Sequence, residues 1–266
     1  MAPIKLSGIY IYPIKSAAGI SLKTAQVENR GFQYDRRWML VDDTGKFLSQ
    51  RQLPRMALIS VLLEGDKLVV KAPNKETLFI PLHLDRGSRI SVQVWKDVCE
   101  AIPLGEEVSQ WFSGFLEISC QLVYMPESSF RPVDSRYAID NKPVSFADGF
   151  PFLLISEASL EDLNERLDEP VPMNRFRPNL VVSGCEPFAE DGWRLIRIGS
   201  IAFHVVKPCD RCAITTINQA QGIQGKEPLQ TLAQYRRRNG KILFGQNLIQ
   251  AKLGTLQVGD LVAIDQ

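Results

Sequence analysis

The sequence predicts a mainly β protein with some helix, in the α+β class. Short apolar runs recur through most of the chain and are separated by turns rich in Gly, Asp, Asn and Pro. Few segments show the spacing of apolar residues that an amphipathic helix requires. Because strands this short and frequent are typical of barrels and sandwiches, we expect a barrel-like architecture with a few peripheral helices rather than repeated β-α-β units.

The first half of the chain is expected to form paired strands. Apolar runs with turn residues within or after them lie at residues 5–12, 35–51, 57–73 and 90–104. Pro13 ends the first run, because proline cannot donate a ladder hydrogen bond. Gly45 and Gly65, each near an aspartate, predict hairpin turns in the second and third runs. The fourth run divides into two more short strands.

Three helices are predicted from apolar positions at helical spacing. They lie in residues 105–116, in residues 156–167, and from Pro228 to Tyr235, where proline occupies a favoured first-turn position. Their apolar faces are Val108, Trp111, Phe112 and Phe115 in the first, Leu160, Leu163 and Leu167 in the second, and Leu229, Leu232 and Tyr235 in the third. Ser159 and Asp162 stand at a spacing like that of a capping box. We interpret the leucine stripe of the second helix as core packing.

The second half adds strands around an irregular connection. Strands are expected at residues 177–184 and 195–206, followed by a closing hairpin at residues 254–265. Residues 125–151 are rich in Pro, Ser and Asp, so we expect a loop there, either an inter-domain connection or a mobile loop at an active site. The predicted domains are a smaller, β-rich one at residues 1–125 and a second one at residues 126–266.

Composition argues against several classes of protein. The formal net charge is +1, so no overall field attracts nucleic acid or an anionic membrane. The densest basic run, residues 236–238, follows a predicted helix and is expected to be solvated. The first residues lack the pattern of a signal peptide, and no apolar stretch approaches the ~18 residues of a membrane span. Five cysteines without a secretory signal predict free thiols and a cytoplasmic protein.

Cys209 and Cys212, in VVKPCDRCAITTIN, leave several chemistries open. A structural zinc site needs four ligands, and the other cysteines are isolated in the sequence. A redox pair of the thioredoxin type lies at the start of a helix, whereas AITTIN predicts a strand. Both cysteines fit small buried side chains, although the surrounding Pro, Asp and Arg predict a polar turn. A thiolate for another metal is the fourth alternative.

These segments resemble the MOSC domain, named from the C-terminal domain of molybdenum cofactor sulfurase. The resemblance is carried by KPCDRCAITTIN, GKEPLQTLAQYR and LFGQN, and upstream by FPFLLISEASLEDLNERL and NRFRPNLVVSGCEPFAEDGW. The opening YPIKSAAGISLKTAQVENRGFQYDRRWMLVD resembles the N-terminal β-barrel domain that accompanies MOSC. Together they cover nearly the whole chain and are similar to the amidoxime-reducing molybdenum proteins and their bacterial counterparts. Those counterparts commonly add a two-iron ferredoxin domain, which we do not expect because the sequence stops at Gln266.

The resemblance implies a site for a molybdenum cofactor of the molybdopterin type, to which residues 1–36 contribute. It assigns Cys212 as the thiolate ligand of molybdenum and as the catalytic position, in keeping with the softness of sulfur. Contacts to the cofactor are implied at Lys15, Ser16, Arg36, Arg177 and Asn179, at Arg211 beside the metal, and at Asp148 on the substrate side. Because neighbours on a strand face opposite ways, Arg36 rather than Arg37 is expected to face the pocket. Arg211 is expected to keep the Cys212 sulfur deprotonated.

By the same resemblance the protein is a molybdenum-dependent reductase of N-hydroxylated compounds such as amidoximes, hydroxylamines and N-hydroxylated bases. The sequence contains no Gly-x-Gly-x-x-Gly fingerprint and no cysteine array for an iron–sulfur cluster. Electrons are therefore expected from a separate protein, either ferredoxin-like or a b-type cytochrome with its reductase. The alternative is a carrier that holds the cofactor, or relays sulfur through Cys212 or Cys209, without turnover.

Overall fold

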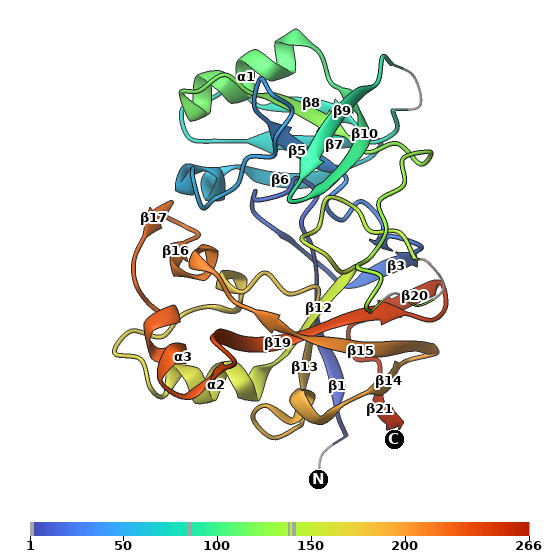
Figure 1. Ribbon diagram of the computed structural model, residues 1–266, viewed down its shortest axis with the longest axis vertical. Coiled ribbons are helices and arrows are strands. Elements are labelled where there is room, and N and C mark those ends of the chain that lie inside the picture. Colours follow the sequence, from blue (N-terminus) through green and yellow to red (C-terminus); the bar gives the residue numbers. More distant parts are fainter. Residues whose placement is uncertain (1–2, 85–86, 138, 140–141, 266) are drawn as a thin grey trace.

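A computed structural model describes residues 3–84, 87–137, 139 and 142–265. Its strands and helices confirm the predicted mainly β, α+β architecture. Figure 1 shows two halves: α1 and β5 to β10 lie in the upper half, and β12 to β19 with α2 and α3 lie in the lower half. The first strand, β1, lies in the lower half, so the chain starts in one half, builds the other, and returns.

The largest sheet combines the C-terminal half of the chain with its first strands. Its order is β2-β1-β13-β12-β19-β15-β14-β21, with β18 beside β19. Its strands are β1 (Lys5–Ile11), β2 (Ile20–Leu22), β12 (Phe152–Ser156), β13 (Leu180–Ser183), β14 (Leu195–Ile198), β15 (Ile201–Asp210), β18 (Arg237–Arg238), β19 (Lys241–Gln250) and β21 (Val262–Asp265). β12 and β13 run parallel. The chain between them carries α2, as a parallel pair requires a crossover.

Smaller sheets and short helices complete the fold. One sheet contains β5 (Trp38–Val41), β9 (Ile90–Val94), β10 (Asp97–Pro103) and β11 (Gln121–Tyr124); a second contains β6 (Ser60–Glu64), β7 (Lys67–Lys71) and β8 (Leu78–Pro81); a third contains β3 (Thr24–Glu28), β4 (Gly31–Phe32) and β20 (Gly254–Gln257); and β16 (Ile217–Asn218) pairs with β17 (Ile223–Gln224). The α-helices are α1 (Glu106–Leu116), α2 (Glu157–Asn164) and α3 (Leu229–Tyr235), and 3₁₀ helices cover Pro54–Leu58, Met173–Arg175, Ala189–Gly192 and Ala213–Thr216. In the described part of the chain, no helix is long and apolar enough to cross a membrane.

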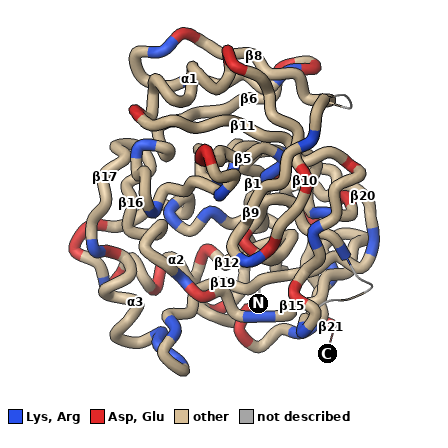
Figure 2. Tube along the Cα trace, turned by 45° about the horizontal axis from the view of Figure 1, so that its top comes forward, with Lys and Arg blue, Asp and Glu red and all other residues tan. Residues whose placement is uncertain are grey.

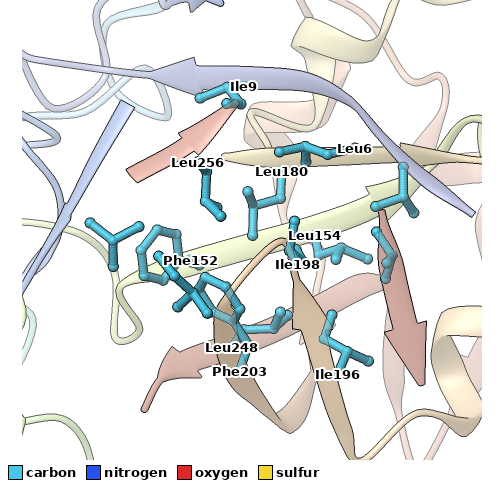
Figure 3. Packing of buried hydrophobic residues seen from close by; sticks show 14 of the residues in the cluster. Leu6, Ile9, Phe152, Leu154, Leu180, Ile196, Ile198, Phe203, Leu248 and Leu256 are labelled. Carbon is cyan, nitrogen blue, oxygen red and sulfur yellow. The ribbon is translucent and has the colours of Figure 1, made fainter. Parts of the chain in front are cut away.

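The main core lies against the large sheet and draws on strands from both ends of the chain. Figure 3 shows members of this cluster from both ends of the chain, among them Ile9 of β1, Leu256 of β20 and Phe152 of β12. The Phe152 ring meets the Phe203 ring edge-on, with 5.3 Å between centroids. Burial of these apolar side chains joins segments that are far apart in sequence and is the main favourable contribution to their association.

The expected helices are present, and their apolar faces are in the core. Phe112 and Phe115 of α1 are buried in a second cluster with Trp38. Leu163 of α2 and Leu232 of α3 are buried in a third cluster. The interpretation of the leucine stripe of α2 as core packing is confirmed, because Leu160 and Leu167 pack against the cluster that contains Leu163.

The hairpin predicted at Gly65 forms, the turn at Gly45 carries only an isolated bridge between Val41 and Phe47, and the closing hairpin does not form. The β6–β7, β9–β10 and β14–β15 pairs are antiparallel hairpins. β20 and β21, predicted to pair with each other, pair instead with β3 and with β14. In this arrangement Leu256 of β20 lies opposite Ala25 of β3, and both are buried in the main core.

The capping assignment in α2 is wrong. Ser156 is the N-cap, and its side chain accepts a hydrogen bond from the Ser159 backbone amide at 3.1 Å. The Ser159 hydroxyl donates instead to the buried carboxylate of Glu190 at 2.8 Å. The sequence signal was ambiguous because two serines precede the leucine stripe at helix-start spacing.

The first residue of the basic run after α3 is buried, although the whole run was predicted to be solvated. Arg236 is buried and forms an ion pair with Asp191, with 2.6 Å between Nη2 and Oδ2. Arg237 and Arg238 are exposed, as expected, and form β18. Arg236 is buried because its guanidinium finds a carboxylate partner, which a buried charge requires.

Residues 125–151 connect β11 to β12 and are irregular wherever they are described; residues 138, 140 and 141 lie outside the described residues. This loop is not merely a surface connection. Met125 and Phe146 are buried in one core cluster, and Val133 and Val144 in another. The loop therefore reaches the junction of the two halves as a packed segment, and it carries Asp148 there.

We expect Phe203→Ala to lower the free energy of unfolding by about 3–5 kcal/mol, because a fully buried aromatic ring leaves a cavity that the sheet cannot close. Urea denaturation followed by circular dichroism measures the change. Phe79→Ala is the control, since Phe79 is 56% exposed, and surface substitutions usually stay within about 0.5 kcal/mol. Equal losses in the two variants would contradict this assignment of the core.

Candidate functional site

A cavity brings every predicted site residue together. Its lining includes Lys15, Ser16, Arg36, Asp148, Arg177, Asn179, Arg211 and Cys212. The cavity, of about 130 Å³, adjoins a wider cleft of about 1240 Å³. Arg51, Asp148 and Cys209 line both spaces, so the cleft leads to the cavity. That these residues bind a cofactor remains a prediction, but their gathering in one place is a property of the fold.

Three residues of the lining have a left-handed backbone. The φ angles are 67° at Ser16, 50° at Arg36 and 56° at Arg177, a region that residues other than glycine seldom adopt. Hydrogen bonds from the surroundings hold these turns. The Arg36 amide donates to the Tyr12 carbonyl at 2.9 Å, and Arg177 Nη1 donates to the Ala17 carbonyl at 2.6 Å. Backbone conformations of this kind cluster at functional sites, where the surrounding fold stabilises them.

The two arginines stack on one buried tyrosine. The guanidinium carbons of Arg36 and Arg177 lie 4.3 and 4.2 Å from the centre of the Tyr12 ring. Tyr12 donates its hydroxyl to the Pro178 carbonyl at 3.0 Å, and burial raises the pKa of this phenol, which keeps it neutral. Burial lowers the pKa of Arg177 to about 10, still high enough for a cation at neutral pH. The ring thus supports two positive charges side by side.

Arg36 and Arg37 point in different directions, as predicted, but for a different reason. Both precede β5, with Arg36 in a turn, and the left-handed backbone at Arg36 directs its side chain toward the cavity. Arg37 is buried elsewhere and pairs with Glu127 at 2.6 Å. Alternation along a strand therefore does not explain the difference.

The side chain of Asn179 forms hydrogen bonds with three neighbouring residues of the site. Its amide oxygen accepts from Arg36 Nη1 at 3.0 Å and from the Leu153 amide at 3.3 Å. Its amide nitrogen donates to the Tyr10 carbonyl at 3.1 Å. With these groups engaged and the residue buried, Asn179 orients the Arg36 guanidinium at the start of β13.

Lys15 and Asp148 form a close ion pair where the cavity meets the cleft. Lys15 Nζ lies 2.5 Å from Asp148 Oδ1 and donates to the Phe146 carbonyl at 2.8 Å. Burial lowers the pKa of Lys15 to about 8, although the Asp148 charge opposes that shift. The Asp148 pocket disfavours ionisation, but the Lys15 ammonium outweighs this and holds the pKa of Asp148 below its usual range. The Asp148 side chain, 61% exposed, remains accessible from the cleft.

The two cysteines have different arginine partners. Cys212 is exposed in the cavity wall, and Arg51 Nη1 donates to its sulfur over 3.6 Å. Arg211 Nη1 donates instead to the sulfur of Cys209 at 3.0 Å. The expectation that Arg211 serves the Cys212 sulfur is thus wrong. Arg51 is the residue that the sequence analysis missed, although it ends the run 35–51 in which a hairpin turn was predicted.

The backbone around the cysteines also differs from the prediction. β15 continues to Asp210, so Cys209 lies in a strand rather than in a polar turn. Pairing with β19 extends the strand past two bulges. After Cys212, residues Ala213–Thr216 form a 3₁₀ helix, and only Ile217 and Asn218 form a strand. Tertiary pairing with β19 therefore overrides the local turn signal of Pro and Asp.

The cavity has an excess of positive charge. Its lining contains the cations Lys15, Arg36, Arg51, Arg177 and Arg211 and the carboxylates Asp148 and Asp210. Five minus two gives +3, whereas the whole chain carries only +1. Figure 2 shows blue segments gathered near the middle of the trace, between the two halves. Arg211 Nε is buried without a hydrogen-bond partner, so a donor is left over for a ligand. The site suits an anionic ligand rich in hydrogen-bond acceptors.

All five cysteines are free thiols. Within the described residues, no three His, Cys, Asp or Glu side chains gather where they would hold a metal ion. The zinc alternative, which needs four protein ligands, therefore has no candidate ligand set in this part of the chain.

Known proteins resemble both halves of the chain. Residues 3–119 match the MOSC N-terminal beta barrel domain, and residues 141–263 match the MOSC domain. Mitochondrial amidoxime-reducing component 1 of Mus musculus is 38% identical over 96% of this chain and 80% of its own length. The chain belongs to the MOSC-domain family.

Two further relatives show the range of names within this family. Mitochondrial amidoxime-reducing component 1 of Homo sapiens is 34% identical over 96% of this MOSC protein and 81% of its own length. Molybdenum cofactor sulfurase of Oryza sativa subsp. japonica is 36% identical over 92% of this chain but only 32% of its own length. These names associate the family with molybdenum cofactor chemistry.

The buried ammonium of Lys15 predicts a pH-dependent difference in stability. Its pKa is about 8 when folded and 10.5 ordinarily, so between these values the unfolded chain binds the proton that the folded protein has lost. The contribution of Lys15 to the free energy of unfolding therefore becomes more favourable as pH rises from 8 to 10.5. We expect the unfolding free energy of the wild type minus that of Lys15→Met to rise by roughly 1–3 kcal/mol from pH 8 to 10.5.

Urea titrations at several pH values measure this difference. Lys67→Met, at an exposed lysine of β7, is the control for loss of a lysine as such. A difference between wild type and Lys15→Met that stays flat over the window, or falls, rules out a buried ammonium at this position.

Proposed function

We propose that this MOSC protein binds a molybdenum cofactor of the molybdopterin type in the cavity, and that Cys212 is the thiolate ligand of the metal. We further propose that it reduces N-hydroxylated compounds such as amidoximes. One observation carries the proposal: the exposed Cys212 thiol lies in the wall of a cationic cavity that adjoins a wide cleft. The amidoxime-reducing relatives support the reaction class.

The chain's residues fit such a group. A pterin with a phosphate needs cations and hydrogen-bond donors, and Lys15, Arg36 and Arg177 provide fixed positive charges in the lining. The unpartnered Arg211 Nε is a buried donor of the kind that a bound ligand satisfies. When bound, the cofactor supplies two-electron redox chemistry at a metal whose sulfur-rich surroundings match a thiolate.

The protein's own part in the reaction is positioning and proton supply. Conversion of an N-hydroxyl group to N–H and water consumes two electrons and two protons. Asp148 faces the cleft and shares a hydrogen bond with the Lys15 ammonium, whose pKa of about 8 lies near neutral pH. A group with a pKa close to the working pH is an efficient proton donor. The pair is therefore placed to hold a proton on the wall that cavity and cleft share.

We infer that electrons arrive from a separate redox protein, ferredoxin-like or a b-type cytochrome with its reductase. This inference rests on the sequence, which contains neither a nucleotide-binding glycine fingerprint nor a cysteine array for a cluster. A cytoplasmic location is likewise a proposal, supported by the five free cysteines.

We expect protein purified from a host that makes the cofactor to contain close to one molybdenum per chain, and Cys212→Ser to lose at least about 90% of it, since serine lacks the soft sulfur ligand. Elemental mass spectrometry measures the metal. Cys209→Ser is the matched control and should keep its molybdenum, because Cys209 belongs to a different arginine contact. Loaded wild type should then reduce benzamidoxime with a chemical reductant, and Cys212→Ser should not.

A carrier that binds the cofactor or relays sulfur is the second candidate. Two thiols, each within reach of an arginine, line the same cavity, and one relative is a sulfurase. Molybdenum-loaded wild type that reduces no N-hydroxylated compound, together with a persulfide on Cys209 or Cys212 by mass spectrometry, would favour this candidate over the reductase.

A further inference from the structure

Trp95 is an exposed aromatic side chain in a conformation that needs support. It lies between Val94 and Asp97, which pair across the tip of the β9–β10 hairpin. Its φ angle is 57°, in the left-handed region, which a bulky residue seldom adopts. The residue is 43% exposed and lines the wide cleft. An aromatic ring kept in the open by a strained turn is a candidate for ligand recognition.

Several contacts fix the indole in place. The Arg51 guanidinium lies 4.3 Å from the ring centre. Trp95 Nε1 donates to Asp148 Oδ1 at 3.2 Å, and the Phe47 ring lies 5.0 Å away between centroids, tilted by 57°. The Gln93 side chain donates to the Trp95 carbonyl at 2.7 Å. Because these contacts are already made, a ligand that stacks on the remaining surface would not have to order the ring.

The same contacts connect the ring to the reaction site. Arg51 also donates to the Cys212 sulfur, and Asp148 also pairs with Lys15. The hairpin that carries Trp95 belongs to the barrel-like half, whereas Cys212 belongs to the MOSC half. The indole therefore joins Arg51 as a group of the barrel-like half at the wall that cavity and cleft share.

The loop beneath the ring is held from the same hairpin. Arg131 is buried, forms an ion pair with Asp97 at 2.9 Å, and donates to the Ala147 carbonyl at 2.6 Å. Asp148, the next residue, accepts the hydrogen bond of Trp95. The loop that carries Asp148 is itself held by the Arg131–Asp97 ion pair. A hydrogen-bonded carboxylate beside an aromatic ring can bind a flat group that carries N–H or O–H donors.

We propose that Trp95 is a specificity-determining residue of the cleft, which selects N-hydroxylated substrates whose reacting group is attached to a flat aromatic or heteroaromatic ring. This inference rests on the proposed reductase function. The ring of the substrate stacks on the open surface of the indole, and its N–H or O–H groups face Asp148. Phe47 and Phe150, which also line the cleft, extend the apolar wall. Aromatic stacking on a fixed ring favours such substrates over saturated ones.

The test compares two amidoximes that differ only in the attached group, benzamidoxime with a ring and acetamidoxime without one. Binding is measured by calorimetry, which requires no turnover, on wild type, Trp95→Leu and Phe79→Leu. Phe79→Leu is the matched control, since Phe79 is an exposed aromatic outside the cleft. We expect wild type and the control to bind benzamidoxime about tenfold more tightly than acetamidoxime, and Trp95→Leu to show a ratio near one, consistent with loss of one stacking contact.

A purely bracing role for Trp95 predicts a different result. If the indole serves only to hold Arg51 and Asp148, Trp95→Leu weakens both amidoximes equally and the ratio stays near ten, which would overturn the proposal. On the loaded enzyme, the ratio of KM for acetamidoxime to KM for benzamidoxime should fall from about ten in wild type to near one in Trp95→Leu. A ratio of the two KM values that is the same in wild type and Trp95→Leu would also contradict the proposal.

A fluorescence measurement keeps the test independent of the folding of Trp95→Leu and of catalysis. Quenching of tryptophan fluorescence by benzamidoxime, but not by acetamidoxime, should be present in wild type and absent in Trp95→Phe, which retains a ring in the hairpin. Quenching that persists in Trp95→Phe contradicts the proposal even where Trp95→Leu fails to fold. A binding preference without any reduction would reject only the proposed reductase, and reduction without a preference would reject only the role of Trp95.

Discussion

The antiparallel pairing of β1 with β13 determines where the rest of the site lies. Ile9 lies opposite Leu180 in this register, which places the end of β1 beside the start of β13. Tyr12 and Lys15, just beyond β1, therefore meet Arg177 and Asn179, just before β13, across more than 160 positions of sequence. Without this pairing the lysine and the arginines would belong to separate halves of the molecule.

Positive charge concentrated in a partly buried place opposes folding unless it is compensated. The protein compensates with a neutral aromatic ring and a few carboxylates. Tyr12 supports two guanidinium groups, Asp35 pairs with Arg36 at 2.6 Å, and Asp148 pairs with Lys15. The compensation is incomplete, because the five cations of the lining exceed the carboxylates Asp35, Asp148 and Asp210 by two charges. That remainder is what an anionic ligand would neutralise on binding.

The two halves contribute different parts of the site. The MOSC half supplies Cys212, Arg177 and Arg211, which surround the cavity. The barrel-like half supplies Arg51 and, from the β9–β10 hairpin, Trp95, which face the cleft. Contacts between these groups, such as the Arg51–Cys212 hydrogen bond, join the halves at the place where chemistry is proposed. A substitution in the β9–β10 hairpin is therefore expected to alter the surroundings of the Cys212 thiol.

The sequence by itself determined the class of the fold, the three helices and the hairpin at Gly65, and it named eight residues that the fold brings into one cavity. These features depend on local patterns, such as leucine spacing in α2 or a turn at Gly65, and on motifs that resemble a known family. Only the tertiary structure decided which distant segments meet. It paired β20 with β3, buried Arg236 on Asp191, and placed Arg51 rather than Arg211 against Cys212. Burial and charge pairing reward contacts between residues far apart in the chain, and no local pattern records those partners.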